Sequence, residues 1–394
     1  MGFFVAMKPK HILFLLGTYP SYGGAEMVTT VLANRFIEDG HCVTIVSFSQ
    51  PKNDFAELHL SKKCHLLSLS YPVLSLKNIK KLKAYVRDWH VDVLINQWVL
   101  PFTVTLMWKW ALAGTGCKVY SVHHNKPDTN RRIEELEIKI NAGRNYLKVL
   151  RYWVREISRQ SLAFCIRSSH QFIVLSPSFV PITEKYARVP KDGKILSITN
   201  PITIDVPSEE LPKEKEMIYV GRIEYNQKRT FRVIDIWKEL EPQFPDWKLT
   251  IVGDGEDRAD LERRIEAYGL KRVIVTGFVN PIAYYQRASL LLLTSEYEGF
   301  GLVIVEAMKF GVVPVVYNSY ETAMDLITDG YNGVLVGRPF DVRTFTKAVK
   351  KLMDETEYWT ELSNNGRISL EKFSVEKIVE EWYKLMEKSC KTNE

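Results

Sequence analysis

Residues 290–316 read LLLLTSEYEGFGLVIVEAMKFGVVPVV, which contains a strand, a glycine-rich loop, a helix and a second strand in succession. The apolar run Leu290–Thr294 predicts a buried strand, and Val313–Val316 predicts another. Between them, Leu302–Phe310 has the apolar spacing of a helix and is followed by Gly311, a common helix end. A strand, a helix and a strand in this order are typical of a parallel sheet covered by helices.

The same alternation continues along the rest of the chain. In the second half, further predicted strands and helices are Met217–Val220, Phe231–Leu240, Lys248–Val252, Asp257–Tyr268 and Val273–Thr276. In the first half, the predicted strands are Ile12–Leu16, Cys42–Phe48, Asp92–Asn96, Cys117–Val122 and Phe172–Leu175. The sequence therefore predicts an α/β fold of two Rossmann-like, doubly wound domains that face each other across a cleft. Ligands of such sheets bind beyond the carboxyl ends of the strands, so residues just after strands are the candidate site.

The length of 394 residues indicates more than one domain, because a domain averages roughly 150 residues. The strand and helix pattern restarts after about residue 200, where three prolines within residues 201–212 interrupt regular structure. We therefore expect an N-terminal domain of residues 1–200 and a C-terminal domain of residues 201–373. Ser374–Ser389 has the pattern of an amphipathic helix, which we count with residues 374–394.

The composition is that of a globular protein, with 46% hydrophobic and 25% charged residues, and it excludes a disordered or coiled-coil chain. The charge is unevenly spread. Residues 1–200 contain 27 Lys and Arg against 14 Asp and Glu, whereas residues 201–394 contain 26 against 33. Such asymmetry indicates different partners for the two halves.

The five scattered cysteines disfavour a zinc site and indicate a reducing compartment. No stretch approaches the roughly 18 apolar residues of a membrane span.

Two cations follow the predicted strand Met217–Val220. Arg222 and Lys228 lie six residues apart in a turn that begins with Gly221. Arg can bind two oxygens at once and Lys acts as a point charge, so the pair suits a phosphate or a diphosphate. Taken alone, the two charges are also compatible with a solvated loop.

Two glycines and two glutamates surround the start of the predicted helix at Leu302. Gly299 and Gly301 come directly before this helix, where free backbone N–H groups can bind an anion. Glu298 lies in the loop and Glu306 inside the helix. Because carboxylates repel phosphate, we expect them to bind the hydroxyl groups of a sugar or a ribose. The alternative is an acid that interacts with the helix dipole and a second acid on the surface.

The sequence predicts no cofactor and no metal. Gly23 and Gly24 follow the first strand, but the G-x-G-x-x-G fingerprint is absent there, which disfavours a nicotinamide or flavin cofactor. No Asp-x-Asp occurs, so a metal held by carboxylates on a nucleotide diphosphate is not indicated. Arg222, Lys228 and the helix starts would then neutralise a diphosphate.

Two histidines, His123 and His124, directly follow the predicted strand Cys117–Val122. A histidine at a strand end can hydrogen-bond a substrate or move a proton. We take His124 as the candidate, although the sequence is equally compatible with His123. The alternative is a pair with a structural role only.

Five cations recur at the spacing of one helix face: Arg144, Lys148, Arg151, Arg155 and Arg159. The neighbouring apolar face is predicted to consist of Tyr146, Val149, Leu150, Trp153 and Ile157. A basic amphipathic helix suits an anionic membrane surface or an acceptor that carries phosphate. The alternative is a solvated helix face. No aromatic stacking platform accompanies the charge, so we expect no nucleic acid.

Together these motifs resemble the retaining family 4 glycosyltransferases, which have the two-domain GT-B fold. The resemblance covers nearly the whole chain and is strongest over residues 217–336. Its most specific element is the pair Glu298 and Glu306 with seven residues between them. The other matching segments are Gly23–Glu26, Val122–Asn125, Asn200–Ile202, Val220–Arg222 with Lys228, Val252–Gly255 and Gly277–Val279.

The resemblance implies a role for each candidate residue. Arg222 and Lys228 would hold the donor diphosphate, Glu298 would contact the donor sugar and His124 would lie near the reacting sugar. The nucleotide-sugar-binding residues that it implies are Gly23, Gly24, Phe278, Val279, Gly299, Phe300, Gly301, Leu302, Val303 and Glu306. It also implies that the C-terminal helix crosses back to the acceptor-binding N-terminal domain, and that the C-terminal domain binds the donor.

The implied activity is transfer of a hexose from a nucleotide-diphosphate-sugar, with UDP preferred to GDP, and with retention of the anomeric configuration. The implied acceptor is a saccharide or a lipid-linked saccharide in the synthesis of a cell-surface polysaccharide or glycolipid. A nucleotide-sugar epimerase of the same architecture and a non-catalytic nucleotide-sugar-binding protein are the alternatives. We expect a cytoplasmic protein, peripheral on the cytoplasmic face of the membrane.

Overall fold

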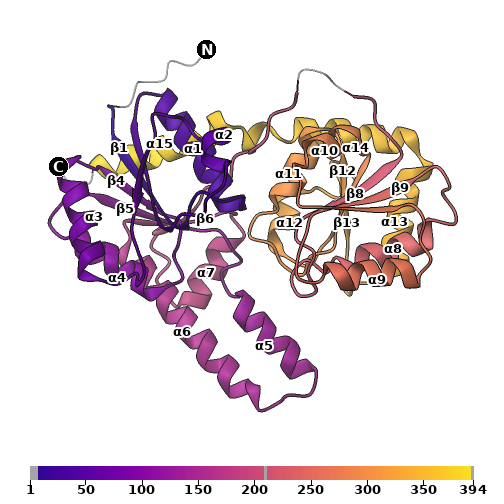
Figure 1. Cartoon of the computed structure of the whole chain (residues 1–394), viewed down its shortest axis with the longest axis horizontal. Helices are drawn as coiled ribbons and strands as arrows, with labels where there is room; N and C mark the ends of the chain where they lie inside the picture. The colour runs from indigo at the N-terminus through magenta and orange to yellow at the C-terminus, as the bar shows by residue number, and fades with distance from the viewer. Residues whose placement is uncertain (1–7, 208–210, 392–394) are drawn as a thin grey trace. The chain divides into compact units, whose positions relative to one another are not determined.

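The computed structural model describes residues 8–207 and 211–391, with side chains up to residue 388. The chain forms two compact units. The first contains the residues up to Thr203 and those from Phe373 onward, and the second is Ile204–Lys372. Each unit is built on one parallel sheet with helices packed against it (Figure 1). The predicted α/β class with two Rossmann-like domains is confirmed.

The first unit contains a seven-stranded sheet with the strand order β3-β2-β1-β4-β5-β6-β7. Its strands are β1 (His11–Thr18), β2 (Cys42–Ser49), β3 (His65–Ser68), β4 (Val93–Asn96), β5 (Lys118–His123), β6 (Gln171–Val174) and β7 (Ile195–Ser197). Its helices are α1 (Gly24–Glu38), α2 (Phe55–His59), α3 (Leu76–Asp88), α4 (Phe102–Ala111), α5 (Arg131–Asn141), α6 (Leu147–Ser168), α7 (Phe179–Ala187) and α15 (Val375–Lys391).

The second unit contains a six-stranded sheet with the strand order β10-β9-β8-β11-β12-β13. Its strands are β8 (Glu216–Val220), β9 (Lys248–Val252), β10 (Val273–Gly277), β11 (Leu290–Leu293), β12 (Val313–Tyr317) and β13 (Val334–Val336). Its helices are α8 (Phe231–Leu240), α9 (Arg258–Ala267), α10 (Ile282–Arg287), α11 (Leu302–Lys309), α12 (Glu321–Leu326), α13 (Val342–Asp354) and α14 (Thr356–Ile368), followed by the short 3-10 helix Glu371–Phe373.

The central strand β11 shows why the second sheet forms. All four of its leucines are fully buried, because a parallel strand between two helical layers has both faces in the core. It pairs with β8 on one side and β12 on the other. Since β8 comes first in the chain and β11 fourth, the strand order reverses between them. The loops that follow these two strands therefore meet at the same point of the sheet edge.

The C-terminal helix α15 belongs to the first unit, as expected. The Tyr383 hydroxyl donates to Asp39 at the end of α1 at 2.7 Å, and Arg35 pairs with Glu376 at 2.8 Å. The side chains of Ile378 and Trp382 are buried. The last turns of the chain thus complete the helical cover of the first sheet.

Candidate active site

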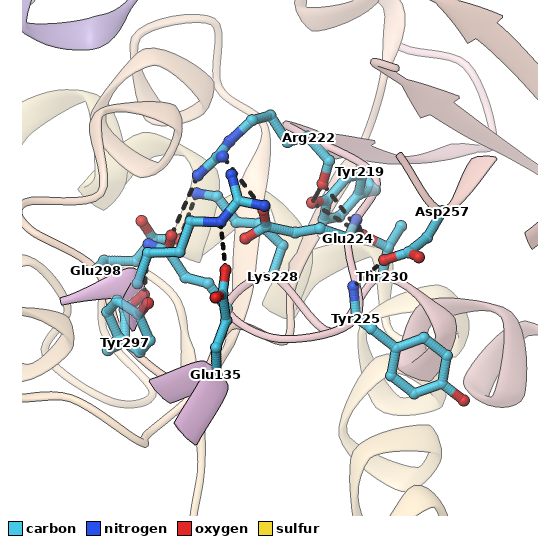
Figure 2. A network of polar contacts seen from close by, with 12 residues as sticks. Glu135, Tyr219, Arg222, Glu224, Tyr225, Lys228, Thr230, Asp257, Tyr297 and Glu298 are labelled. Atoms are coloured by element: carbon cyan, nitrogen blue, oxygen red, sulfur yellow. Dashed lines mark hydrogen bonds and ion pairs between the residues drawn. The ribbon is translucent and has the colours of Figure 1, made fainter. Parts of the chain in front are cut away.

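The two loops that follow β8 and β11 are joined by a network of polar contacts (Figure 2). At its centre, Lys228 Nζ donates to Glu298 Oε1 at 2.7 Å. The Ser295 hydroxyl donates to the same oxygen at 2.7 Å. The Lys228 and Glu298 side chains are only 14% and 8% exposed. The structure therefore brings together two predicted site residues and orients the carboxylate with a third group.

Arg222 lies at the rim of this site. Its guanidinium reaches Glu224 at 3.2 Å and the Gln227 side-chain oxygen at 3.2 Å. The side chain is 58% exposed, so it can still bind an anion from solvent. The Arg222 backbone is held in place, because the buried Tyr219 hydroxyl donates to the Arg222 carbonyl at 2.7 Å.

Further bonds join the two loops along their length. The Glu296 amide donates to the Gln227 carbonyl at 2.8 Å, and the Gln227 side chain donates to the Tyr297 carbonyl at 3.1 Å. Arg232 pairs with Glu296 at 2.6 Å. These contacts hold Lys228 and Glu298 in place. Rigid placement of this kind is what electrostatic catalysis requires.

Helix α11 begins at this site. Gly301 precedes it with φ +92°, and a Cβ there would lie 3.1 Å from Ile304 Cδ1. The Ile304 amide is the first to bond back, to the Gly301 carbonyl at 2.9 Å. The amides of Leu302 and Val303 precede the first amide that bonds back within the helix, so they can donate to an anion at the helix start.

Glu306, the second acid of the predicted pair, lies within α11. The Tyr285 hydroxyl donates to Glu306 Oε2 at 3.1 Å. Burial and the Glu306 charge raise the pKa of Tyr285 well above its usual value, so this hydroxyl keeps its proton and orients the carboxylate. Phe278 and Val279, the residues predicted to contact the base, follow β10 with side chains 67% and 39% exposed.

The first unit places its candidate residues after β1 and at the end of β5. Gly23 caps α1, and Gly24 is the first residue of that helix. His124 Nε2 lies in hydrogen-bond contact with Oε1 of Gln97, which follows β4. Since the strand order also reverses between β1 and β4, these residues lie at the corresponding edge of the first sheet.

His123 differs from its prediction, because it is the last residue of β5 rather than part of the following loop. It pairs with Val174 of β6, and its ring lies 6.3 Å from that of Phe172. The side chain is 2% exposed, and neither ring nitrogen has a hydrogen-bond partner among the described residues. Burial lowers the pKa of His123 to about 3, so the ring is neutral at physiological pH.

The predicted basic helix also needs correction. Helix α6 begins at Leu147, so Arg144 lies in the preceding turn, where Gly143 has φ +92°. Of the four predicted cations that lie on the helix, Arg151 pairs with Glu137 and Arg159 with Glu156. The prediction that five cations share one helix face is therefore wrong for Arg144, and two of the other four are held in ion pairs.

Several residues that contact the candidates were not singled out from the sequence. In the first unit this is Gln97. In the second unit they are Glu224, Gln227, Arg232, Tyr285, Ser295 and Glu296. Most lie just after strands, which was the only available signal. Within residues 8–207 and 211–391, no group of three or more His, Cys, Asp or Glu side chains has the geometry to hold a metal ion.

Two family models match the chain. The one described as "Glycosyl transferases group 1" matches residues 202–369, and "Glycosyltransferase Family 4" matches residues 22–206. A Haemophilus influenzae protein described as an uncharacterized glycosyltransferase is 26% identical over 386 residues, which are 95% of this chain and 99% of the relative. A Campylobacter jejuni α-1,4-N-acetyl-D-galactosaminyltransferase, named for a diNAcBac-PP-undecaprenol-linked GalNAc disaccharide, is 26% identical over 390 residues, 95% and 98% of the two chains.

Solved structures show the same architecture. HepE of Anabaena, in complex with UDP and glucose, has a TM-score of 0.72 at 19% identity and covers 96% of this chain and 100% of its own. The lipopolysaccharide outer core galactosyltransferase WaaB has a TM-score of 0.67 at 19% identity, with coverage of 95% and 98%. The two parallel-sheet units thus have the GT-B fold. Since the two family models together span residues 22–369, the chain belongs to the family 4 type of glycosyltransferases.

Proposed function

We propose that this glycosyltransferase moves a hexose from a nucleotide-diphosphate-sugar, with UDP preferred to GDP, to a saccharide or lipid-linked saccharide. The anomeric configuration is retained and no metal is required. The observation that carries the proposal is the convergence of Arg222, Lys228 and the start of α11 at one sheet edge. UDP in the HepE complex and the undecaprenol-linked substrate named for the Campylobacter relative support the choice of donor and acceptor.

The charges at this edge match the chemistry of the reaction. As the bond from the sugar to the diphosphate breaks, negative charge grows on the leaving group. Arg222, Lys228 and the first amides of α11 stabilise this charge more in the transition state than in the ground state. Positive charge develops on the sugar, and Glu298, held beside Lys228 and Ser295, favours it. The protein's own cations thus supply what a metal ion would otherwise supply.

The remaining candidates bind the rest of the donor. Glu306 accepts hydrogen bonds from the ribose hydroxyls, and the Phe278–Val279 backbone contacts the base. The Gly23 and Gly24 amides at the start of α1 approach the phosphates, and the Gly299 and Phe300 amides before α11 bind the same group. Of the two histidines, His123 has two unpartnered ring nitrogens, whereas the His124 ring already contacts Gln97. A buried histidine without partners favours His123 as the group that meets the reacting sugar.

The pathway is the synthesis of a cell-surface polysaccharide or glycolipid, at the cytoplasmic face of the membrane. No helix among the described residues is both long and apolar enough to cross a membrane. An epimerase and a non-catalytic binding protein of the same fold are the competing functions. An incubation of the nucleotide-sugar without acceptor distinguishes them, because an epimerase converts the donor to its epimer and a binding protein leaves it unchanged.

The test is a mass-spectrometric screen of UDP- and GDP-sugars with soluble and lipid-linked saccharides. We expect one UDP-sugar to yield a product heavier by one hexose unit, at the same rate with and without EDTA. Proton NMR of that product should show the anomeric configuration of the donor. Formation of an epimer from the donor alone would establish the epimerase instead, and binding of UDP without any product would establish the non-catalytic function.

A further inference from the structure

Helices α5 and α6 form a hairpin that extends away from the first sheet (Figure 1). Ile133 and Leu136 of α5 are buried against Leu147 and Val154 of α6. Later in α6, Leu162, Cys165 and neighbouring residues pack into the core of the unit. One face of α6 is therefore fully used by packing within the protein.

A second face of the same helix is apolar but faces solvent. Tyr146, Val149, Trp153 and Ile157 are 74%, 66%, 57% and 65% exposed, and Leu150 is 43% exposed. Their spacing of three and four residues places them on one side of the helix. Single exposed apolar residues are common, whereas five large ones on one helix face mark a surface that meets another apolar phase.

Cations accompany this apolar face. The hairpin, residues 131–168, contains nine Lys and Arg but four Glu. Two of the arginines, Arg151 and Arg159, are held in ion pairs. Within the described part of the chain, Arg144 and Lys148 form no ion pair and lie exposed beside Tyr146 and Val149. The tip of the hairpin thus combines an apolar, aromatic face with uncompensated positive charge.

We propose that this tip, residues 144–157, docks onto an anionic phospholipid surface. Trp and Tyr are favoured at the boundary between headgroups and acyl chains, and an amphipathic helix with cations beside its apolar face binds there in the plane of the interface. Each cation near an anionic leaflet adds to the attraction. A second protein would need a surface that is complementary to both the apolar face and the unpaired cations of the hairpin. An anionic bilayer offers acyl chains to the apolar face and anionic headgroups to the cations at every point of its surface.

The docking proposal rests on the proposed function, in which the acceptor is a lipid-linked saccharide. The docking surface brings the protein to the membrane that holds such an acceptor. The surface acts in binding only, so it can fail without affecting sugar transfer to a soluble saccharide. The two proposals are therefore tested by different readouts of the same protein.

The test is flotation of the full chain with vesicles of phosphatidylcholine alone and of phosphatidylcholine with 30% phosphatidylglycerol. We expect binding to the anionic vesicles, weakened by added salt. Arg144→Gln with Lys148→Gln should reduce it roughly ten- to thirty-fold at low salt, and Trp153→Ser with Ile157→Ser should reduce it at least as much. Matched controls on the second unit, Lys347→Gln and Ile368→Ser, change an exposed cation and a 68% exposed isoleucine and should bind like the parent chain.

Three results would overturn the docking proposal. The first is equal binding of the parent chain to both kinds of vesicle. The second is unchanged vesicle binding by both hairpin variants. The third is that the parent chain binds no vesicle but forms a concentration-dependent dimer, which the Trp153→Ser variant does not form. Transfer to a soluble acceptor is measured in parallel. Lost vesicle binding with intact transfer is the pattern that we expect of the hairpin variants. Vesicle binding by a parent chain that transfers no sugar would contradict the proposed function and leave the docking surface supported.

Discussion

At the scale of single residues, the ion pair between Lys228 and Glu298 decides how the site behaves. Both side chains are largely buried, and Ser295 also donates to the carboxylate. Removal of one partner of a buried pair leaves an uncompensated charge, which is more costly than removal of both. The pair is therefore a part of the fold as well as a candidate part of the chemistry.

We predict that Lys228→Ala lowers the free energy of unfolding of the second unit by about 3 kcal/mol. The double variant Lys228→Ala with Glu298→Gln should regain most of this loss, because no buried charge is left alone. Urea unfolding followed by circular dichroism measures both. A double variant that is less stable than the single one would show that the Glu298 charge has other partners that it needs.

His123 provides a second prediction at this scale. Burial lowers its pKa from 6.5 to about 3. Between these values the unfolded chain binds a proton at this position and the folded chain does not, so stability falls as the pH drops below 6.5. The contribution is about 1.4 kcal/mol per pH unit. Replacement by a side chain without a titrating group, His123→Phe, should make the unfolding free energy less dependent on pH between 6.5 and 5. Identical slopes for the two proteins would contradict the buried, neutral ring.

For single residues, the sequence predicted which residues lie at the site better than it predicted their hydrogen-bond partners. Lys228 and Glu298 were both singled out because they follow strands, but nothing in the sequence shows that side chains 70 residues apart share one hydrogen bond. The same holds for Gln227 and Ser295, whose roles depend on the pairing of β8 with β11. The assigned roles in donor binding remain predictions.

At the scale of elements, the loop after β9 controls the loop that carries Arg222. Gly253 has φ +154°, and a Cβ there would come within 1.9 Å of the Gly221 carbonyl oxygen. The Gly221 backbone cannot move aside to relieve this contact, whereas a flexible side chain could. The close approach of the two backbones thus requires a glycine at this position.

We therefore predict that Gly253→Ala weakens UDP binding by displacing the loop that carries Arg222. The added methyl group must push the 221–228 loop away from its place, and the protein should lose about 2–4 kcal/mol of stability. Gly337→Ala is the matched control, because no atom lies within 4 Å of its added Cβ. Calorimetric titration with UDP compares the two. Equal affinities in both variants would show that the loop position does not matter for the donor.

Among the elements themselves, apolar runs were informative and short edge strands were not. The helix Phe231–Leu240 was predicted with the bounds that it has, since it is amphipathic and followed by Pro242. The strands β3, β7 and β13 were not predicted, because each has only three or four residues and mixes apolar with polar or exposed positions. Arg144 was placed on the following helix because spacing alone does not reveal the turn at Gly143.

At the scale of the whole molecule, the two units differ in how much of the chain each needs. The second unit is one continuous segment, and its largest core cluster lies wholly inside it. The first unit needs the C-terminal helix, which buries Ile378, Val379, Trp382 and Met386. Burial of each such side chain contributes about 1.5–3 kcal/mol.

We predict that residues 204–372 fold when expressed alone and bind UDP, whereas residues 1–203 alone do not form a stable domain. Circular dichroism melting and a UDP titration test both statements. A cooperative transition for residues 1–203 would contradict the importance of α15. An unfolded 204–372 fragment would show that the second unit depends on the first.

The uneven charge of the chain has a structural counterpart. The acidic second half concentrates cations at one sheet edge, where Arg222, Lys228 and Arg232 converge. The basic first half includes the hairpin with its excess of five positive charges. On our two proposals, donor recognition by placed cations and surface attraction by dispersed ones would belong to different halves of the chain.

The central claim is that the cations at the second sheet edge drive sugar transfer. It is tested most directly by the turnover number of the Lys228→Ala variant with its nucleotide-sugar, measured under conditions where circular dichroism shows that the variant is folded. We predict a reduction of at least about 100-fold, with the Lys228→Ala, Glu298→Gln double variant equally impaired and Lys347→Ala unaffected. Turnover by folded Lys228→Ala equal to that of the parent chain would contradict the claim.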